Sequence, residues 1–229
     1  MCIRDSMKEE EIHYNYYFWG PLLFKATVND VDLKKLKKIC KKRKDWDYRH
    51  NLAGVIDNEY EIDRKEFINI VNRYISAYAQ AFKLYYGKEM PGVLNIDSAW
   101  VNYMKKGESN PMHIHLPCDL SSVLYLDVPD ELLEEQRQFT GKGGGPGSIS
   151  FFNQCPAPGF VGQQVFKPKT GDFFIYPAML CHSVATFKSD IERVSIAANF
   201  SFRVVDANNK PTDISPDGWQ VRQKDVWGG

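Results

Sequence analysis

The sequence predicts a mainly β, α+β fold whose core is a β-sandwich or jelly roll. From Gly92 onward, short runs of branched and aromatic residues are separated by Gly, Pro, Asn and Asp, the pattern of strands joined by turns. Before that point, two segments repeat apolar residues at helical spacing. The chain has 229 residues and 43% of them are apolar, so a single domain can bury a sizeable core.

The N-terminal half is expected to hold one strand and two helices. Residues 16–28 mix aromatic and branched side chains and predict a strand. Asn29 and Asp30 can cap a first helix, and Asp63 with Glu66 resembles the capping box of a second. The second helix carries an apolar stripe typical of core packing and should end near Gly87.

The C-terminal half is expected to hold seven or eight short strands. The candidates are residues 99–105, 112–116, 120–128, 148–153, 172–176, 181–187 and 193–204, with a brief helix over 129–137. The glycine-rich segment 141–147 lacks a following Lys-Ser or Lys-Thr and precedes a strand. It is therefore interpreted as a flexible turn and not as a phosphate-binding loop.

Charge and composition exclude several classes of protein. Twenty-nine basic residues balance twenty-nine acidic ones, and no apolar run is long enough for a membrane-spanning helix. The first helix has a lysine-rich face. Without interleaved aromatic residues or a nucleic-acid-binding module, that face is expected to be solvated, and nucleic acid is not the expected partner.

The two ends of the chain are expected to lie outside the folded domain. Residues 1–6 match the translation of a transposon adapter used in sequencing libraries and lack the apolar run of a signal peptide, so Met7 is the expected start. The other cysteines are scattered without a CxxC pair, which indicates reduced thiols in a cytoplasm. We expect one domain over 7–205, comprising 7–91 and a jelly-roll core over 92–205, followed by a polar tail over 206–229.

Three histidines in the strand-rich half form a candidate metal site. Residues two apart on a strand point to the same face, so His113 and His115 can aim at one point. His182 would add a third ligand from a distant strand, which leaves open positions on the opposite side of the metal. For each histidine taken alone, an ordinary core or surface position is the default interpretation, and it is the combination that favours a metal site.

Arg193 follows His182 at a spacing that suits a small dicarboxylate. If Lys188-Ser189-Asp190 forms a hairpin turn, Arg193 lies diagonally across from His182, about 7–10 Å away. One end of a five-carbon keto diacid can then chelate the metal while the guanidinium binds the far carboxylate bidentately.

These residues resemble the iron(II)- and 2-oxoglutarate-dependent oxygenases, in particular bacterial and phage members related to prolyl hydroxylases. The resemblance covers residues 99–202 and is carried by the following motifs: His113-Ile-His115, Leu120-Ser-Ser-Val-Leu-Tyr125-Leu, Gly171-Asp-Phe-Phe-Ile-Tyr-Pro177, His182 and Arg193-Val-Ser195. It implies a double-stranded β-helix (jelly-roll) core with N-terminal support helices.

The resemblance also implies roles for individual residues. His113 and His182 match iron ligands, Arg193 and Ser195 match the pair that holds the 2-oxoglutarate tail, and Tyr103 and Tyr125 match tyrosines that contact the co-substrate. One position departs from the family pattern, because His115 stands where an Asp or Glu is expected. His115, Asp119 and a water molecule all remain candidates for the third metal position.

The expected activity is that of a dioxygenase (hydroxylase) that uses Fe(II), 2-oxoglutarate and O₂. The resemblance implies decarboxylation of 2-oxoglutarate to succinate and hydroxylation of a C–H bond, with a protein or peptide side chain as the leading substrate class. Two alternatives stay open: a non-catalytic, cupin-like metal-binding module, and a three-histidine dioxygenase that needs no 2-oxoglutarate. The polar set Arg193, Ser195, Tyr103 and Tyr125 argues against the latter.

Overall fold

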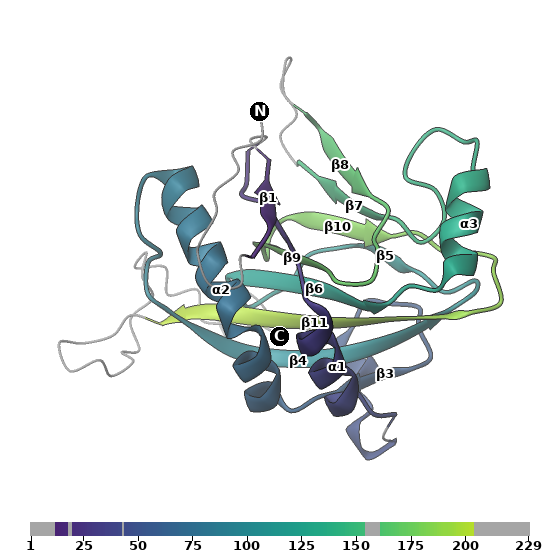
Figure 1. Ribbon diagram of the computed structural model, residues 1–229, viewed down its shortest axis with the longest axis horizontal. Coiled ribbons are helices and arrows are strands. Elements are labelled where there is room, and N and C mark those ends of the chain that lie inside the picture. The colour runs from purple at the N-terminus through teal and green to yellow at the C-terminus, as the bar shows by residue number, and fades with distance from the viewer. Residues whose placement is uncertain (1–11, 18–19, 43, 154–160, 204–229) are drawn as a thin grey trace, which may run out of the picture.

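The computed structural model describes residues 12–17, 20–42, 44–153 and 161–203, and its core is a pair of antiparallel β-sheets (Figure 1). The larger sheet has the order β1 (Tyr14–Tyr16), β2 (Phe24–Thr27), β9 (Asp172–Pro177), β6 (Leu120–Asp127), β11 (Glu192–Arg203), β4 (Val93–Lys105) and β3 (Glu59–Glu61). The smaller sheet has the order β5 (Asn110–His113), β10 (Cys181–Val184), β7 (Ile149–Phe152) and β8 (Gln163–Phe166). The predicted jelly-roll core is confirmed.

Apolar side chains from both sheets meet in a shared core. Met104, Tyr125 and Phe174 of the larger sheet belong to the same buried cluster as Phe151 and Val184 of the smaller sheet. Successive residues of a strand face opposite sides, so each of these strands presents alternate residues to the space between the sheets. The functional side chains described below project into this space.

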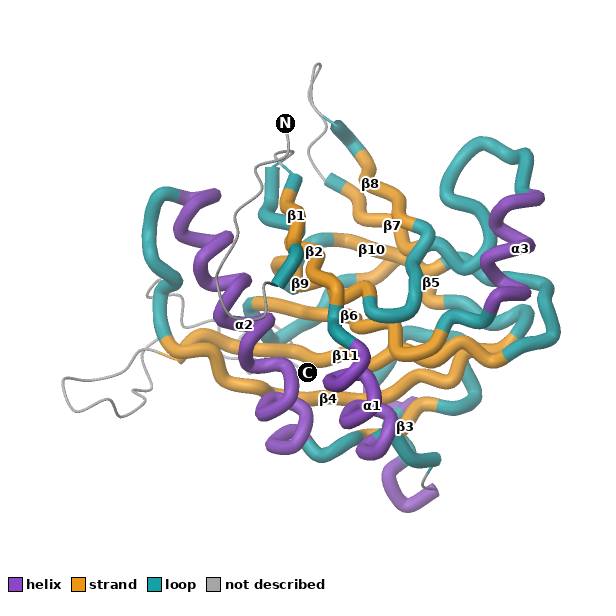
Figure 2. The backbone as a smooth tube through the Cα atoms, viewed as in Figure 1, coloured by secondary structure: helices purple, strands orange, loops and turns teal. Residues whose placement is uncertain are grey.

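Two helices cover the outer face of the larger sheet (Figure 2). They are α1 (Asp30–Ile39) and α2 (Arg64–Tyr86), and both begin as predicted. The Asn29 side chain accepts a hydrogen bond from the Asp32 N–H at 2.8 Å. At the start of α2, the Asp63 carboxylate accepts hydrogen bonds from the N–H groups of Lys65 and Glu66. Gly87 ends α2 with a left-handed φ of 67°, which glycine adopts without steric cost.

The short elements differ from the prediction. The strand expected over residues 16–28 is two separate strands, β1 and β2, and the sequence analysis missed β3 and β8. Each has only three or four residues, too few to show an alternating pattern. The brief helix over 129–137 is confirmed as α3 (Asp130–Gln138), and short 3₁₀ turns lie at Lys44–Trp46 and Arg49–Asn51.

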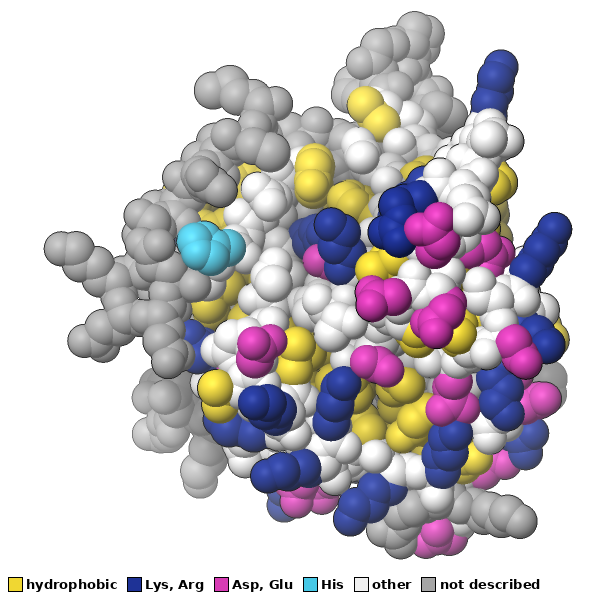
Figure 3. Space-filling view, turned by 45° about the vertical axis from the view of Figure 1, so that its right-hand side comes forward, with side chains coloured by type: hydrophobic (Ala, Val, Ile, Leu, Met, Phe, Trp, Pro, Cys, Tyr) yellow, Lys and Arg dark blue, Asp and Glu magenta, His cyan; other side chains and the backbone are white. Residues whose placement is uncertain are grey.

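The surface carries both signs of charge. Basic and acidic side chains are interspersed over the face in Figure 3. Within the lysine-rich segment around α1, Lys37 pairs with Asp127 at 3.2 Å and Lys42 with Glu192 at 2.7 Å, which partly neutralises it. In the described part of the chain, no helix combines the length and apolar character needed to cross a bilayer. The predicted leader 1–6 and the tail 206–229 lie outside the described residues.

Candidate metal and co-substrate site

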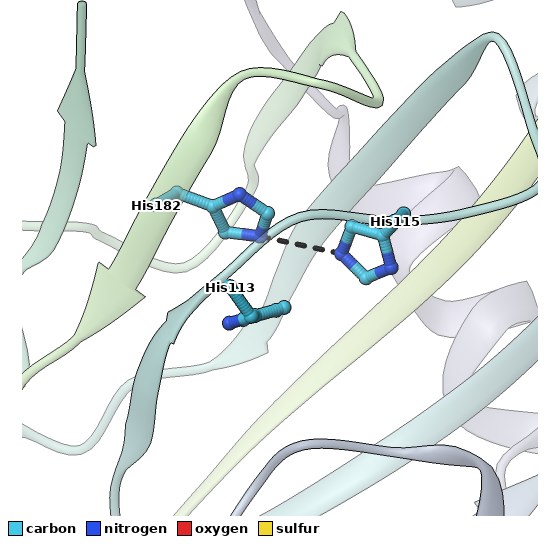
Figure 4. Close-up of side chains that lie close together, drawn as sticks. All are labelled: His113, His115 and His182. Atoms are coloured by element: carbon cyan, nitrogen blue, oxygen red, sulfur yellow. Dashed lines mark hydrogen bonds between the residues drawn. The ribbon is translucent and has the colours of Figure 1, made fainter. Parts of the chain in front are cut away.

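The three predicted histidines converge between the sheets (Figure 4). His113 ends β5 and His182 lies on the neighbouring strand β10, where the two are register partners. His115 follows β5 in a loop whose backbone is tied to the Ala178 carbonyl by a 3.0 Å hydrogen bond. One ligand nitrogen from each imidazole lies within 4.8 Å of the other two, an arrangement that can hold a metal ion.

The reason why His115 points into the site differs from the prediction. The expected strand 112–116 ends at His113, so His115 is not on the same strand face by simple alternation. Instead, the chain turns after His113, and the His115 Nε2 lies 3.3 Å from the His182 Nε2. Residues 115–118 form a turn between two strands, and the separation of two residues in the sequence does not reveal this turn.

Backbone carbonyls orient two of the three rings. The His113 Nδ1 lies 2.7 Å from the Pro111 carbonyl and the His182 Nδ1 lies 2.8 Å from the Leu180 carbonyl. A carbonyl only accepts, so each Nδ1 carries the proton and each Nε2 presents its lone pair. This is the arrangement in which an outer hydrogen bond fixes the tautomer of a metal-ligating histidine.

Burial keeps the three imidazoles neutral. Burial, with a smaller contribution from electrostatic repulsion by the His113 ring, lowers the pKa of His182 to about 3. Burial and the two neighbouring rings lower the pKa of His115 to about 3, and burial also lowers the pKa of His113. At neutral pH the cluster therefore offers uncharged nitrogen donors, the form that binds metals.

Asp119, the carboxylate considered for the third position, is engaged elsewhere. Its Oδ2 accepts a 2.7 Å hydrogen bond from the Phe202 N–H, and its own N–H donates to the Phe200 carbonyl. These contacts hold Asp119 against the end of β11. Of the three candidates for the third position, His115 is the side chain that lies beside His113 and His182.

The predicted hairpin between His182 and Arg193 is wrong. β10 pairs with β5 and β7, whereas β11 pairs with β4 and β6, so the two residues lie in different sheets. The chain between them crosses from one sheet to the other, as a jelly roll requires, and does not reverse locally. Both side chains nevertheless line the same cavity, because Arg193 faces the histidines across the space between the sheets.

Arg193 is a buried cation without a carboxylate partner among the residues that the structure describes. The residue is 2% exposed. One terminal nitrogen donates to the Gly147 carbonyl at 3.0 Å, the other approaches the Met104 sulfur at 2.9 Å, and Nε has no hydrogen-bond partner. The Tyr125 ring lies 5.1 Å from the guanidinium carbon. A buried, uncompensated guanidinium is costly, which indicates a site for an anion.

Of the other predicted co-substrate residues, two line the cavity and one lies on the opposite face of the larger sheet. Ser195 and Tyr125 line the cavity with Arg193, and the hydroxyl of Tyr125 is buried without a hydrogen-bond partner. Tyr103 occupies the opposite face of β4, in the core under the helices, 6.1 Å from the Tyr60 ring. The structure therefore does not bring Tyr103 to the cavity, and its neighbour Asn102 lines the cavity instead.

The sequence analysis gave no role to three further residues that lie at the cavity. The Tyr176 hydroxyl is 3.2 Å from the His182 Nε2, and burial raises the pKa of this tyrosine. Asn102 approaches the Ser195 hydroxyl at 3.5 Å, and Trp100 lies 6.0 Å from His115 between ring centroids. Tyr176 lies in the motif Gly171–Pro177, which carries part of the family resemblance. That motif is the sequence signal that could have pointed to this tyrosine.

Comparison with known proteins agrees with this geometry. Residues 98–199 match a family model described as "Putative 2OG-Fe(II) oxygenase". No curated protein matches the sequence. A Pseudomonas putida prolyl-4-hydroxylase structure is 16% identical, with 81% of this chain and 94% of that chain covered and a TM-score of 0.52.

The carbocyclase SnoK from nogalamycin biosynthesis is also similar in structure. It is described as a non-heme, alpha-ketoglutarate-dependent enzyme and is 11% identical, with 86% of this chain and 91% of that chain covered and a TM-score of 0.52. At these identities the likeness is one of fold. The family match spans the strands from β4 to β11 that build the cavity. Residues 98–199 therefore resemble the iron(II)- and 2-oxoglutarate-dependent oxygenases in sequence as well as in fold.

Proposed function

We propose that this protein is an Fe(II)- and 2-oxoglutarate-dependent dioxygenase that hydroxylates a C–H bond of its substrate. The observation that carries the proposal is the pairing of a buried, uncompensated Arg193 with a neutral histidine cluster in one cavity. A dicarboxylate that chelates a metal through its keto acid end meets both requirements at once.

The side chains present fit the metal that the family implies. His113, His115 and His182 would hold Fe(II), since imidazole suits iron and three ligands on one side leave other positions open. When bound there, Fe(II) with O₂ would supply the oxidation of 2-oxoglutarate to succinate and of the substrate C–H bond. The three ligands are neutral, so the site would keep the full positive charge of the ion and attract an anionic co-substrate.

The chain itself binds and orients the co-substrate. The unpaired Nε of Arg193 and its planar guanidinium suit a distal carboxylate, and the Ser195 hydroxyl lies on the same face of β11 two residues on. The buried Tyr125 hydroxyl offers a further donor. Because Val123, Ile149 and Val184 also line the cavity, bulk water is kept from this polar set and its electrostatic interactions are strengthened.

The proposal extends to the substrate class, the bounds of the domain and the cellular location. A protein or peptide side chain is the class that the likeness to a prolyl-4-hydroxylase favours. We take residues 7–205 as one oxygenase domain. A cytoplasmic location is supported by the free thiols of Cys40, Cys118 and Cys181.

Substrate-independent turnover tests the proposal. Full-length protein with Fe(II), 2-oxoglutarate and O₂ should release succinate slowly. Arg193→Met should abolish this release at low co-substrate concentration, whereas Arg203→Met, at an exposed arginine of the same strand, should not. No succinate from the wild-type protein, under conditions where it retains iron, would favour the non-catalytic metal-binding module.

The donor set favours a second candidate. Three histidines without a carboxylate are also the expected ligands of a dioxygenase that needs no 2-oxoglutarate. Oxygen consumption that is independent of 2-oxoglutarate would support that activity. Against it, such an enzyme binds no dicarboxylate and so gives no role to the buried Arg193.

A further inference from the structure

A second hollow adjoins the histidine cluster on the side away from Arg193. It shares Trp100, Asn110, His113 and His115 with the co-substrate cavity, while Arg193 and Ser195 do not line it. Its outer wall comes from the 3₁₀ segment at Arg49–Asn51, the preceding Tyr48, and β3. If the cavity beside Arg193 holds the co-substrate, this hollow is where a substrate reaches the metal.

A buried carboxylate lines this hollow. Glu59 on β3 is 1% exposed, and its Oε2 has no hydrogen-bond partner. No cation pairs with it within the described ranges, since the nearby Arg49 binds Asp47 through two nitrogens at 2.6–3.1 Å. A carboxylate left in this state costs free energy unless a donor arrives to pair with it.

The surroundings of Glu59 favour a positive charge over a neutral donor. Burial, the largest effect, and the carboxylates of Glu108 and Asp47 raise the pKa of Glu59 to about 7, against an opposing effect of Arg49. A cation that pairs with Glu59 would stabilise its ionised form, which a neutral donor does less well. Two further buried oxygens have no hydrogen-bond partner: the Oδ1 of Asn199, which lines the hollow, and the Oδ1 of Asn102, the register partner of Glu59. The region therefore has an excess of unsatisfied acceptors. An incoming cation with several N–H groups satisfies more of these atoms than a neutral group does.

Aromatic rings complete the pocket. Tyr48 and Trp100 both line the hollow and stack on each other with their centroids 5.5 Å apart. Carboxylate and aromatic faces together are the recurring means of binding ammonium and guanidinium groups.

We propose that Glu59 determines substrate specificity by accepting hydrogen bonds from a cationic nitrogen group of the substrate, an ammonium or a guanidinium. This inference rests on the proposed function for the identity of the hollow as the substrate side of the metal. It narrows the substrate to a molecule or peptide whose positive group lies within a few bonds of the oxidised carbon.

Calorimetric titration of the full chain tests the inference. Under anaerobic conditions with Fe(II) and 2-oxoglutarate, n-butylguanidinium and n-butylammonium are compared with their neutral isosteres n-butylurea and n-butanol. At least one cation should bind about tenfold or more tightly than its isostere, as a charge-assisted bond to a buried carboxylate implies. Equal affinity within both pairs would overturn the proposal.

Matched variants locate the effect. Glu59→Gln keeps the shape but removes the charge, and it should abolish the preference for the cation. Glu66→Gln, the same change at an exposed position of α2, should preserve it. A preference that survives in Glu59→Gln would contradict the assignment. Should that variant fail to fold, the comparison of cation and isostere in the wild-type protein still decides the outcome.

The same samples separate this inference from the oxygenase proposal. The visible charge-transfer band of the Fe(II)–2-oxoglutarate chelate reports on the co-substrate site alone. A band without a preference for cations refutes the role of Glu59 and leaves the oxygenase proposal standing. A preference for cations without a band supports cation binding by Glu59 and refutes the oxygenase proposal.

Discussion

His113 and His182 lie directly opposite each other on the antiparallel strands β5 and β10, with their ring centroids 4.3 Å apart. Backbone pairing fixes this separation, and each ring is further held by a carbonyl two residues earlier in the chain. His115 depends on a single backbone hydrogen bond beyond the end of β5. Two of the proposed ligands are therefore set by the sheet and the third by a loop.

This difference predicts the order of effects when the histidines are replaced. His113→Ala and His182→Ala should each lower Fe(II) affinity by more than about tenfold, and His115→Ala should lower it by no more than these. His115→Asp should keep iron, because carboxylate and imidazole both bind it, but should weaken 2-oxoglutarate binding by removing one positive charge from the site. Competition with a chelator measures the iron affinities.

His115→Ala also offers the clearest contradiction. If that variant binds iron and turns over 2-oxoglutarate like the wild-type protein, His115 is not a ligand. The third position would then belong to solvent, because Asp119 is held against the end of β11.

Arg193→Met should weaken 2-oxoglutarate binding severely while leaving Fe(II) affinity nearly unchanged, since the guanidinium faces the cavity from the opposite sheet. Arg193→Lys should restore only part of the affinity, because an ammonium cannot form the bidentate pair. Titration of 2-oxoglutarate into the iron-loaded variants measures this, with Arg203→Met as the control. Unchanged affinity in Arg193→Met would refute the assignment of this residue.

The metal-free protein should lose stability in mild acid. His115 and His182 have an ordinary pKa of 6.5 when unfolded and about 3 when folded, so the unfolded chain binds more protons below pH 6.5. Their contribution to the free energy of unfolding is complete above that pH and is lost as the pH falls toward 3. Urea unfolding between pH 7 and 4 should show a shallower loss in His115→Gln. Parallel profiles for the two proteins would contradict the burial of a neutral His115.

Removal of the cap of α2 should destabilise the fold without affecting the site. Asp63→Ala deletes the acceptor for two backbone N–H groups and should cost about 1 kcal/mol of unfolding free energy. Asp190→Ala, which breaks an exposed and solvent-screened ion pair with Lys106, should cost much less. Urea denaturation distinguishes the two, and equal losses would argue against the cap.

Local signals in the sequence predicted much of the fold. Asn29 and Asp63 were recognised as helix starts because capping depends on residues that are neighbours in the chain. The predicted hairpin before Arg193 was wrong because whether a strand pairs locally or crosses to another sheet depends on the closure of the whole barrel. The same limit hid Glu59, whose importance arises from contacts with the segments around Tyr48 and Trp100.

The candidate site was predictable mainly from residue type. The sequence singled out His113, His115, His182 and Arg193, and all four line one cavity. The strand alternation expected for His115 and the hairpin expected for Arg193 are not what brings them there. Tyr103 was selected by resemblance, and the register of β4 turns it to the helix side. A shift of one residue along a strand reverses the face, and the sequence alone does not fix that register.

Anaerobic titration of Fe(II) and 2-oxoglutarate into the full-length protein tests the central claim most directly. The account predicts a visible charge-transfer band that appears only when both are present, saturates at one equivalent of each, and is lost in His182→Ala. In Arg193→Met the band should require much more 2-oxoglutarate. A protein that binds Fe(II) at the three histidines but shows no band at any 2-oxoglutarate concentration would contradict the account.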